Sequence, residues 1–259
     1  MIVLPMAGLS SRFFKAGYEV PKYMLDLHGS TVFAHALGGF HGLFGAERFL
    51  IICRDVYGTP EFVRAQFEKL GLPAADLDLV VLSAPTDGQA ETVALGLRGA
   101  NGGAGVDPDA PITIFNIDTF RPGFAHPTGF DVAAVDGYWE VFEGAGDHWS
   151  FARPATGGAP FAVAEVTEKV RISDLCSDGL YHFRRAGMFL DLYAEIEAKD
   201  PAELQGGERY VAPLYNTAIA RGADIRYALI GPDQVRFCGT PDEYDALRAR
   251  PPFAPTDPA

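Results

Sequence analysis

A short loop of small residues, followed by basic side chains, opens the chain and could bind phosphate. Residues 2–6 read as a buried strand, and the segment Ala7-Gly8-Leu9-Ser10-Ser11 follows it directly, before Arg12. Backbone N–H groups of such a loop can point at phosphate oxygens, while Arg12, Lys15 and Lys22 would neutralise their charge. The loop lacks the ending of a P-loop and the spacing of a dinucleotide-binding loop. A plain Gly/Ser turn with solvated lysines is the alternative.

Asp118 is the first candidate metal ligand. It ends the apolar run PITIFNID, and open α/β sheets place ligand-binding residues at the carboxyl ends of their strands. A carboxylate there can hold Mg²⁺ against triphosphate oxygens, because this ion prefers hard oxygen ligands. The alternative is an Asp that only forms a turn.

A Glu-Lys pair in the second half could contact a second phosphate. Glu168 and Lys169 follow the strand-like run FAVAEV, and a Lys held over a sheet can pair with an acceptor phosphate. A solvated pair on a surface is the alternative interpretation. The six His are scattered along the chain and show no ligand spacing.

Composition excludes several classes of partner. A net charge of −13 argues against nucleic acid and anionic membrane surfaces as partners. The first residues, MIVLPMAG, carry no basic region and break at Pro5, so we expect a cytoplasmic protein without a signal peptide or membrane span. Cys53, Cys176 and Cys238 match no metal spacing, and we expect buried, reduced thiols.

Strands that alternate with helices must position these residues. We expect strands at 2–6, 48–53, 79–82 and 111–116, with helices between them, and a helix that starts at the N-cap Thr59 before Pro60. This order predicts a largely parallel sheet covered on both faces. The second half predicts an antiparallel lobe, with strands at 130–135, 149–153, 161–166, 180–183, 225–229 and 235–237 and helices at 186–198, 210–221 and after 241.

We find no linker that divides the chain. The expectation is one domain over residues 1–250, with 1–120 binding the nucleotide and 121–250 forming the acceptor-binding lobe and closing helices. Residues 251–259 are Pro-rich and are predicted to be a flexible tail.

In this order the motifs resemble the sugar-phosphate nucleotidyltransferase family, which includes the glucose-1-phosphate thymidylyltransferases and related capsule and lipopolysaccharide enzymes. The resemblance covers about residues 1–247. It is carried by the segments MAGLSSRF, Pro21-Lys22, Asp87-Gly88-Gln89-Ala90, Asn116-Ile117-Asp118, Glu168-Lys169, Gly179-Leu180-Tyr181-His182-Phe183 and Gly239-Thr240-Pro241-Asp242-Glu243-Tyr244.

The resemblance implies a three-layer α/β/α nucleotide-binding sandwich with a mixed, mainly parallel sheet and a small antiparallel lobe. It also implies a Mg²⁺-dependent reaction in which the phosphate of a small acceptor attacks the α-phosphorus of an NTP (CTP, UTP or dTTP), releasing pyrophosphate. The acceptor would be a sugar phosphate or another small phosphorylated metabolite, and the product a precursor of capsular polysaccharide or lipopolysaccharide. Homo-oligomer formation stays open.

The same resemblance assigns roles to residues. Arg12 would bind the triphosphate, Lys22 the α-phosphate, and Asp118 the Mg²⁺; Glu168 and Lys169 would bind the acceptor. The expected nucleotide-binding residues are Met6, Ala7, Gly8, Leu9, Ser10, Ser11, Ser83, Gly88 and Gln89.

Two departures from the family pattern affect these assignments. Phe237 stands two residues before Gly239, where the family commonly has an acidic metal ligand. The insertion FKAGYEV between residues 13 and 21 resembles the capsule-associated branch, which leaves the acceptor open. A glycosyltransferase that uses a nucleotide-sugar is one alternative, although Asn116 stands where its Asp-x-Asp motif needs an Asp. A catalytically inactive nucleotide-binding regulator is the other, supported by Phe237.

Overall fold

The structure, a computed structural model, describes residues 1–251, so that the expected tail lies outside the described residues except for Pro251. The α-helices are α1 (Ser11–Lys15), α2 (Val32–Gly38), α3 (Thr59–Lys69), α4 (Gln89–Gly103), α5 (Ala186–Glu197), α6 (Leu214–Ala220) and α7 (Pro241–Arg248). Short 3-10 turns are η1 (Lys22–Met24), η2 (His41–Leu43), η3 (Ala74–Asp76), η4 (Pro201–Glu203) and η5 (Gln205–Gly207).

The strands of the main sheet are β1 (Ile2–Pro5), β4 (Phe49–Arg54), β5 (Leu77–Leu82), β6 (Ile112–Phe115), β8 (Gly137–Glu143), β9 (Ser150–Pro154), β10 (Val163–Glu168), β11 (Leu175–Phe183) and β12 (Ile225–Ile230). They pair in the order β10-β9-β11-β6-β1-β4-β5, and β8 joins β11 to β12. Two small pairs, β2 (Asp26–Leu27) with β3 (Ser30–Thr31) and β7 (Thr119–Phe120) with β13 (Arg236–Phe237), lie apart from this sheet.

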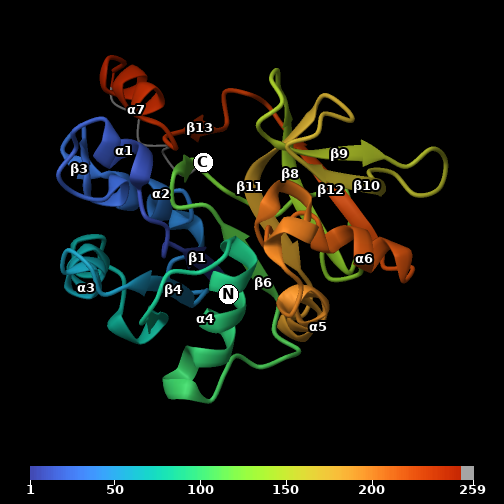
Figure 1. Cartoon of the computed structure of the whole chain (residues 1–259), viewed down its shortest axis with the longest axis horizontal. Coiled ribbons are helices and arrows are strands. Elements are labelled where there is room, and N and C mark those ends of the chain that lie inside the picture. The colour runs from blue at the N-terminus through green and yellow to red at the C-terminus, as the bar shows by residue number, and fades with distance from the viewer. Residues whose placement is uncertain (252–259) are drawn as a thin grey trace.

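The sheet changes direction at one strand. From β6 through β1 and β4 to β5 all neighbours are parallel, whereas β11 runs antiparallel to β6, β8 and β9. The long strand β11 therefore joins the parallel part to the antiparallel part, as Figure 1 shows. The expected α/β sandwich with a mixed sheet and an antiparallel portion is confirmed.

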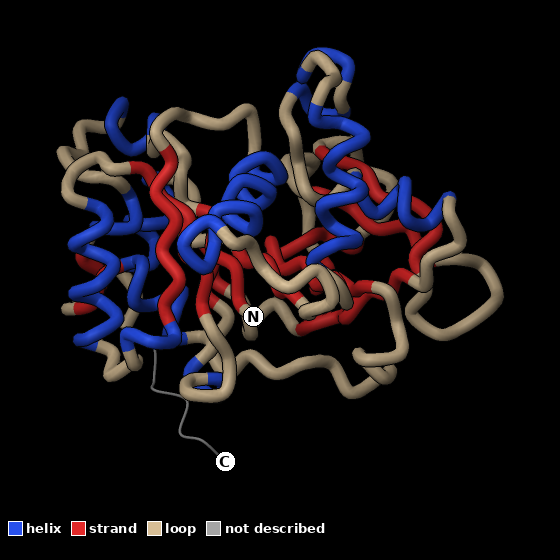
Figure 2. The backbone as a smooth tube through the Cα atoms, turned by 90° about the horizontal axis from the view of Figure 1, so that it is seen from below, coloured by secondary structure: helices blue, strands red, loops and turns tan. Residues whose placement is uncertain are grey.

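Alternating strand residues build a core on each face of the sheet. Ile2 and Leu4 of β1 pack into one cluster with α2 and α3, while Val3 packs into the other with α4, α5 and α6. Helices thus cover both faces, and Figure 2 shows the strands running between them. The last helix, α7, returns to α1 (Figure 1). The rings of Tyr244 and Phe13, whose centres are 6.2 Å apart, join the two helices.

The predicted strand at 130–135 is wrong. Asp131 forms a turn instead: its Oδ1 accepts the N–H of Ala133 at 3.0 Å and its carbonyl accepts that of Ala134 at 3.1 Å. The apolar residues Phe130 and Val135 pack on the core from this turn, and the strand begins only at Gly137. Helix α6 likewise starts four residues later than the predicted 210.

The start of α3 differs from the prediction by one residue. Gly58, in the left-handed region at φ 65°, is the N-cap, and Thr59 is the first helical residue. The Thr59 hydroxyl is fully buried and donates to the carbonyl of Val56 at 2.6 Å, and it also bonds the Tyr23 hydroxyl at 2.8 Å. The Thr59 hydroxyl therefore bonds Tyr23, which is distant in the sequence, and does not cap the helix.

All three thiols are buried and free, as the sequence predicted. Cys53 and Cys238 belong to the cluster that contains α2 and α3, and Cys176 lies in a third, smaller cluster with Phe142 and Phe151. Among residues 1–251, no helix combines the length and apolarity that crossing a membrane requires.

Candidate functional site

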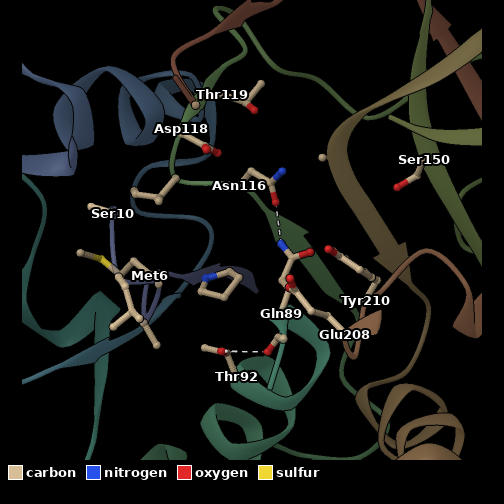
Figure 3. A pocket seen from close by; sticks show the side chains of 18 of the residues that line it. Met6, Ser10, Gln89, Thr92, Asn116, Asp118, Thr119, Ser150, Glu208 and Tyr210 are labelled. Carbon is tan, nitrogen blue, oxygen red and sulfur yellow. Dashed lines mark hydrogen bonds between the residues drawn. The ribbon is translucent and has the colours of Figure 1, made fainter. Parts of the chain in front are cut away.

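A pocket of about 800 Å³ lies at the carboxyl ends of β1 and β6. Its walls come from the loop after β1, the turn before α4, the loop after β6, strands β9 to β11, residues 201–210 and the segment around β13. Figure 3 shows Met6 and Ser10 on one side, Gln89 and Thr92 below, and Ser150 and Tyr210 on the opposite side. Segments from both halves of the sequence therefore face one cavity.

The loop after β1 brings most of its predicted residues to the pocket. Met6, Ala7, Gly8, Leu9, Ser10 and Arg12 line it, whereas Ser11 does not. Ser10 adopts the left-handed conformation at φ 51° and its Oγ accepts the backbone N–H of Lys22 at 3.2 Å. This bond joins the loop to the turn that carries Lys22.

Lys22 and Asp118 form an ion pair inside the pocket. Lys22 Nζ lies 2.5 Å from Asp118 Oδ2, and each side chain keeps about a fifth of its surface exposed. Burial by itself would raise the pKa of Asp118, but the charge and hydrogen bond of Lys22 outweigh it, so that the pKa lies below its usual value. Arg12 adds to this lowering. The carboxylate stays ionised at neutral pH.

Secondary structure fixes both partners of this pair. Lys22 starts η1, whose next residue, Tyr23, is buried and hydrogen-bonded to Thr59. The backbone carbonyl of Asp118 accepts the N–H of Cys238 at 2.8 Å, where β13 meets β7. The pair is therefore held from two sides.

The surroundings of Asp118 offer few further metal ligands. Residues 1–251 contain no group of three or more His, Cys, Asp or Glu placed to hold a metal. Glu243 is near, but its Oε2 accepts the N–H groups of Gly239 and Thr240 at 2.9 Å each, in the capping box of α7. Phe237 packs on Trp149, with ring centres 4.6 Å apart, and lines the pocket as an apolar residue.

This donor set fits magnesium. Mg²⁺ in proteins is commonly bound by one or two carboxylates, with substrate phosphates and water as the remaining ligands. Asp118 supplies one carboxylate, next to a loop that can face phosphates. A site closed entirely by protein ligands is not what these residues would form.

The turn before α4 forms the floor of the pocket. Gly88 and Gln89 line it, and Gln89 Nε2 donates to Asn116 Oδ1 at 2.5 Å (Figure 3). Asn116 lies over Gly179, where an added Cβ would come within 2.2 Å of its Nδ2. Ser83, the remaining predicted nucleotide-binding residue, is exposed and does not line the pocket.

Glu168 and Lys169 lie at the end of β10 but face different surroundings. Glu168 is buried, lines the pocket and accepts the Ser150 hydroxyl at 2.5 Å, and burial raises the pKa of its carboxyl group. Lys169 is exposed at φ 56° and does not line the pocket; its Nζ lies 4.4 Å from the ring centre of Tyr210 and bonds the Tyr210 hydroxyl. Lys169 therefore stands at the rim, behind Tyr210.

Several pocket residues were not predicted. They include Tyr23, Thr92, Asn116, His148, Trp149, Ser150, Asp178, Tyr181, Glu208 and Tyr210. Of these, Asn116 and Tyr181 lie within quoted family motifs, so their positions were available from the sequence. Glu208 and Tyr210 lie in an irregular segment, and no pattern in the sequence marks them.

Buried charges lie next to Asp178, a residue that lines the pocket. Arg121 Nε donates to Glu140 Oε1 at 2.5 Å, and both residues are almost fully buried. Burial, followed by the negative charge of Glu140, raises the pKa of Asp178 well above its usual value. Its Oδ1 accepts the N–H of Leu180 at 3.0 Å, at the irregular part of β11 between Ser177 and Tyr181.

No protein-family model matches the chain, and no curated protein matches it. The chain is similar to the crystal structure of the nucleoside-diphosphate-sugar pyrophosphorylase from Vibrio cholerae RC9, with 49% sequence identity and a TM-score of 0.89. That match covers 96% of this chain and 100% of the other.

Two more distant structures share the fold. The inositol-1-phosphate CTP transferase from T. maritima is 13% identical with a TM-score of 0.71, over 95% of this chain and 93% of the other. A UDP-glucose pyrophosphorylase complexed with UDP-glucose is 15% identical with a TM-score of 0.70, over 95% and 96%. The resemblance noted in the motifs is confirmed, and this chain belongs to the nucleoside-diphosphate-sugar pyrophosphorylases of the sugar-phosphate nucleotidyltransferase family.

Proposed function

We propose that this protein transfers a nucleotidyl group from an NTP to a small phosphorylated acceptor and releases pyrophosphate. An oxygen of the acceptor phosphate forms a bond to the α-phosphorus, and the bond from that phosphorus to the α,β-bridging oxygen breaks. The electron pair of the broken bond leaves with pyrophosphate. The ion pair of Lys22 with Asp118, inside a pocket that reaches both halves of the chain, is the observation that carries this proposal.

The residues on the nucleotide side have the chemistry that this step needs. Arg12 can pair with triphosphate oxygens, and Lys22 can stabilise the negative charge that develops at the α-phosphate. Gly8 and Gly88 both line the pocket, where the base and ribose would bind. No side chain has to form a covalent bond, because positioning and charge neutralisation are enough.

Asp118 would hold the Mg²⁺ that the family membership implies. When bound, the ion would neutralise charge on the phosphate oxygens as a Lewis acid. Lys22 keeps Asp118 ionised, and therefore available as a ligand, down to a pH below the ordinary range of a carboxyl group.

The acceptor would bind beside Glu168, where Trp149, Tyr181 and Tyr210 also line the pocket. Glu168 is fixed by Ser150, and Lys169 stands at the rim, where it can reach an acceptor phosphate by leaving Tyr210. CTP, UTP or dTTP is the proposed donor, since one structure of the same fold is a CTP transferase and another holds UDP-glucose. A product made in the cytoplasm for capsular polysaccharide or lipopolysaccharide agrees with the resemblance to the capsule-associated branch.

Pyrophosphate release tests the proposal directly. CTP, UTP, dTTP, ATP and GTP are each incubated with a panel of sugar phosphates and other phosphorylated metabolites, with Mg²⁺ and with EDTA. We expect Mg²⁺-dependent release with one pair. Lys22→Met and Asp118→Asn should each lower kcat/KM for that pair by about 100-fold or more, because each removes one charge from the reacting centre.

Lys69→Met is the matched control, because Lys69 is exposed at the end of α3 and does not line the pocket. It should leave the rate unchanged. Nucleotide binding without pyrophosphate release from any pair would contradict the proposal and favour the inactive regulator. Sugar transfer from a nucleotide-sugar would favour the glycosyltransferase.

A further inference from the structure

Residues 205–210, here called the bridging segment, contact the acceptor side of the pocket at several points. Gln205 Oε1 accepts the backbone N–H of Glu168 at 3.0 Å, and the Tyr210 hydroxyl bonds Lys169 Nζ. The approach is tight: a Cβ on Gly206 would lie 2.8 Å from the Tyr210 ring and 3.0 Å from the Glu168 side chain. The segment therefore sets the positions of both proposed acceptor-binding residues.

The same segment is joined to the turn on the nucleotide side through the backbone of Arg209. The Arg209 N–H donates to the carbonyl of Asp87 at 2.8 Å, and the Arg209 carbonyl accepts the N–H of Ala90 at 2.8 Å. Between these two bonds, a Cβ on Gly88 would lie 2.6 Å from the Arg209 nitrogen and oxygen. Because the two backbones touch, a shift of the Gly88 turn has to move residue 209 as well.

The Arg209 side chain strengthens this junction. It is only 7% exposed, and its Nη1 donates to Asp87 Oδ2 at 2.8 Å, with Glu91 Oε2 at 3.6 Å. Its Nη2 donates to the carbonyls of Glu197 and Lys199, at 3.0 Å each. The rigid fork of the guanidinium thus ties the Asp87 turn to the end of α5, which a lysine ammonium cannot reproduce.

We infer that Arg209 is a positioning residue that couples the two substrate subsites, so that a nucleotide bound at the Gly88 turn orders the bridging segment and sets Glu168 and Lys169 for the acceptor. The inference rests on the proposed function. The proposed step at the α-phosphorus uses Arg12, Lys22 and Asp118, and no side chain of the bridging segment. The coupling should therefore appear in acceptor binding rather than in kcat.

Hydrogen exchange measures the coupling with the nucleotide alone. The probes are the α,β-methylene analogues of CTP, UTP and dTTP with Mg²⁺, which cannot release pyrophosphate. In the wild type, the analogue that binds should slow exchange of the amides in residues 6–12 and also in residues 205–210. In Arg209→Lys and Asp87→Asn, protection should remain at 6–12 and be lost at 205–210.

Steady-state kinetics give the second readout. They use the NTP and the acceptor that the pyrophosphate-release experiment identifies. Arg209→Lys and Asp87→Asn should raise the KM of the acceptor by about fivefold or more and change kcat little. The side chain of Asp87 is 64% exposed, so Asp87→Asn should not disturb folding. A rise in the acceptor KM in this variant can therefore be assigned to the lost contact with Arg209. Arg98→Lys is the matched control: Arg98 also pairs with α5, through Glu197 at 2.6 Å, but does not touch the Asp87 turn in any bond found among residues 1–251.

The outcomes distinguish this inference from the proposed function. Protection at 6–12 without protection at 205–210 in the wild type would overturn the coupling and leave the nucleotidyltransferase intact. An equal rise in acceptor KM for Arg98→Lys would also overturn it, because any loosening of α5 would then suffice. Absence of protection at 6–12 with all three analogues, together with no pyrophosphate release from any of the five NTPs, would overturn both.

Discussion

At the scale of single residues, charge and burial act in opposite directions on the groups of the pocket. Lys22 keeps Asp118 ionised, whereas burial raises the pKa of Glu168. A carboxylate that binds a metal must be charged, while one that contacts acceptor hydroxyl groups can also work when protonated. The opposite directions of the two pKa shifts thus agree with the different roles proposed for Asp118 and Glu168.

A buried histidine away from the pocket predicts how stability depends on pH. Burial, and then the nearby His126, lower the pKa of His182 to about 3. The unfolded chain takes up a proton at this histidine below about pH 6.5, but the folded chain does not, so stability falls as the pH drops. The contribution of His182 should be a loss of about 1.4 kcal/mol between pH 7.5 and 5.5.

Urea unfolding followed by tryptophan fluorescence at the two pH values tests this. The His182→Asn variant loses the hydrogen bond to Thr113 and is less stable at both, but its loss between them should be smaller than that of the wild type by about the same 1.4 kcal/mol. His41→Asn, at an exposed position, should keep the wild-type difference. An unchanged difference in His182→Asn would show that the histidine is not held neutral by the fold.

At the scale of elements, the turn before α4 depends on one glycine. Gly88 has φ 143°, and an added Cβ would meet the backbone of residue 209. Gly88→Ala should displace the turn and lower kcat/KM for the NTP by about 10- to 100-fold, since small misplacements in a binding site have effects of that size. Gly102→Ala, at φ 68° but with no atom within 4 Å, should cost only about 1–2 kcal/mol of stability and leave kcat/KM unchanged.

Kinetics and thermal melting of the two variants separate these effects. A fall in kcat/KM of the same size for Gly102→Ala would mean that backbone strain alone, and not contact with the bridging segment, explains the loss.

The sequence predicts those elements whose signal is local. The runs MIVLP, RFLIIC and PITIF are strands because continuous apolar residues are buried on both faces of a parallel sheet. Strand β8, GYWEVFE, was missed because its charged Glu140 interrupts the apolar pattern, and Glu140 is buried in an ion pair with Arg121. That pairing joins residues 19 positions apart and leaves no local pattern.

The candidate site divides in the same way. The loop at 6–12, Lys22, the Gly88 turn and Asp118 come from segments with recognisable order along the chain, and the structure brings them to one cavity. Glu208, Arg209 and Tyr210 come from an irregular segment, whose contacts with residues 87–90 and 168–169 are tertiary. Sequence spacing carries no information about such contacts.

At the scale of the whole molecule, both halves of the chain share one sheet. Strand β6 has β1 on one side and β11 on the other, and one core cluster contains Val3 and Ile114 together with Trp139 and Phe183. Separating residues 1–120 from the rest would expose this cluster to water. Fragments 1–120 and 121–259 should each fail to show a cooperative thermal transition, whereas the full chain should show one.

Circular dichroism of the two fragments and of the full chain tests this prediction. A cooperative melt of fragment 1–120 alone would contradict it, and would mean that the nucleotide side folds without its antiparallel neighbour. The full chain, purified in the same way, serves as the control for conditions.

The reaction rates of the buried thiols can report local opening of the protein. Burial raises the pKa of Cys53 to about 11 and, with help from Asp118, that of Cys238 to about 12. Because only an exposed thiolate reacts quickly, a thiol reagent added to the native protein should label each cysteine only when the region that buries it opens. Cys238 is bonded through its backbone to Asp118, and Cys176 lies in the separate cluster beside β9. The order in which these thiols become labelled would therefore report whether the region around Asp118 or the region around β9 opens first, without any added dye or tag.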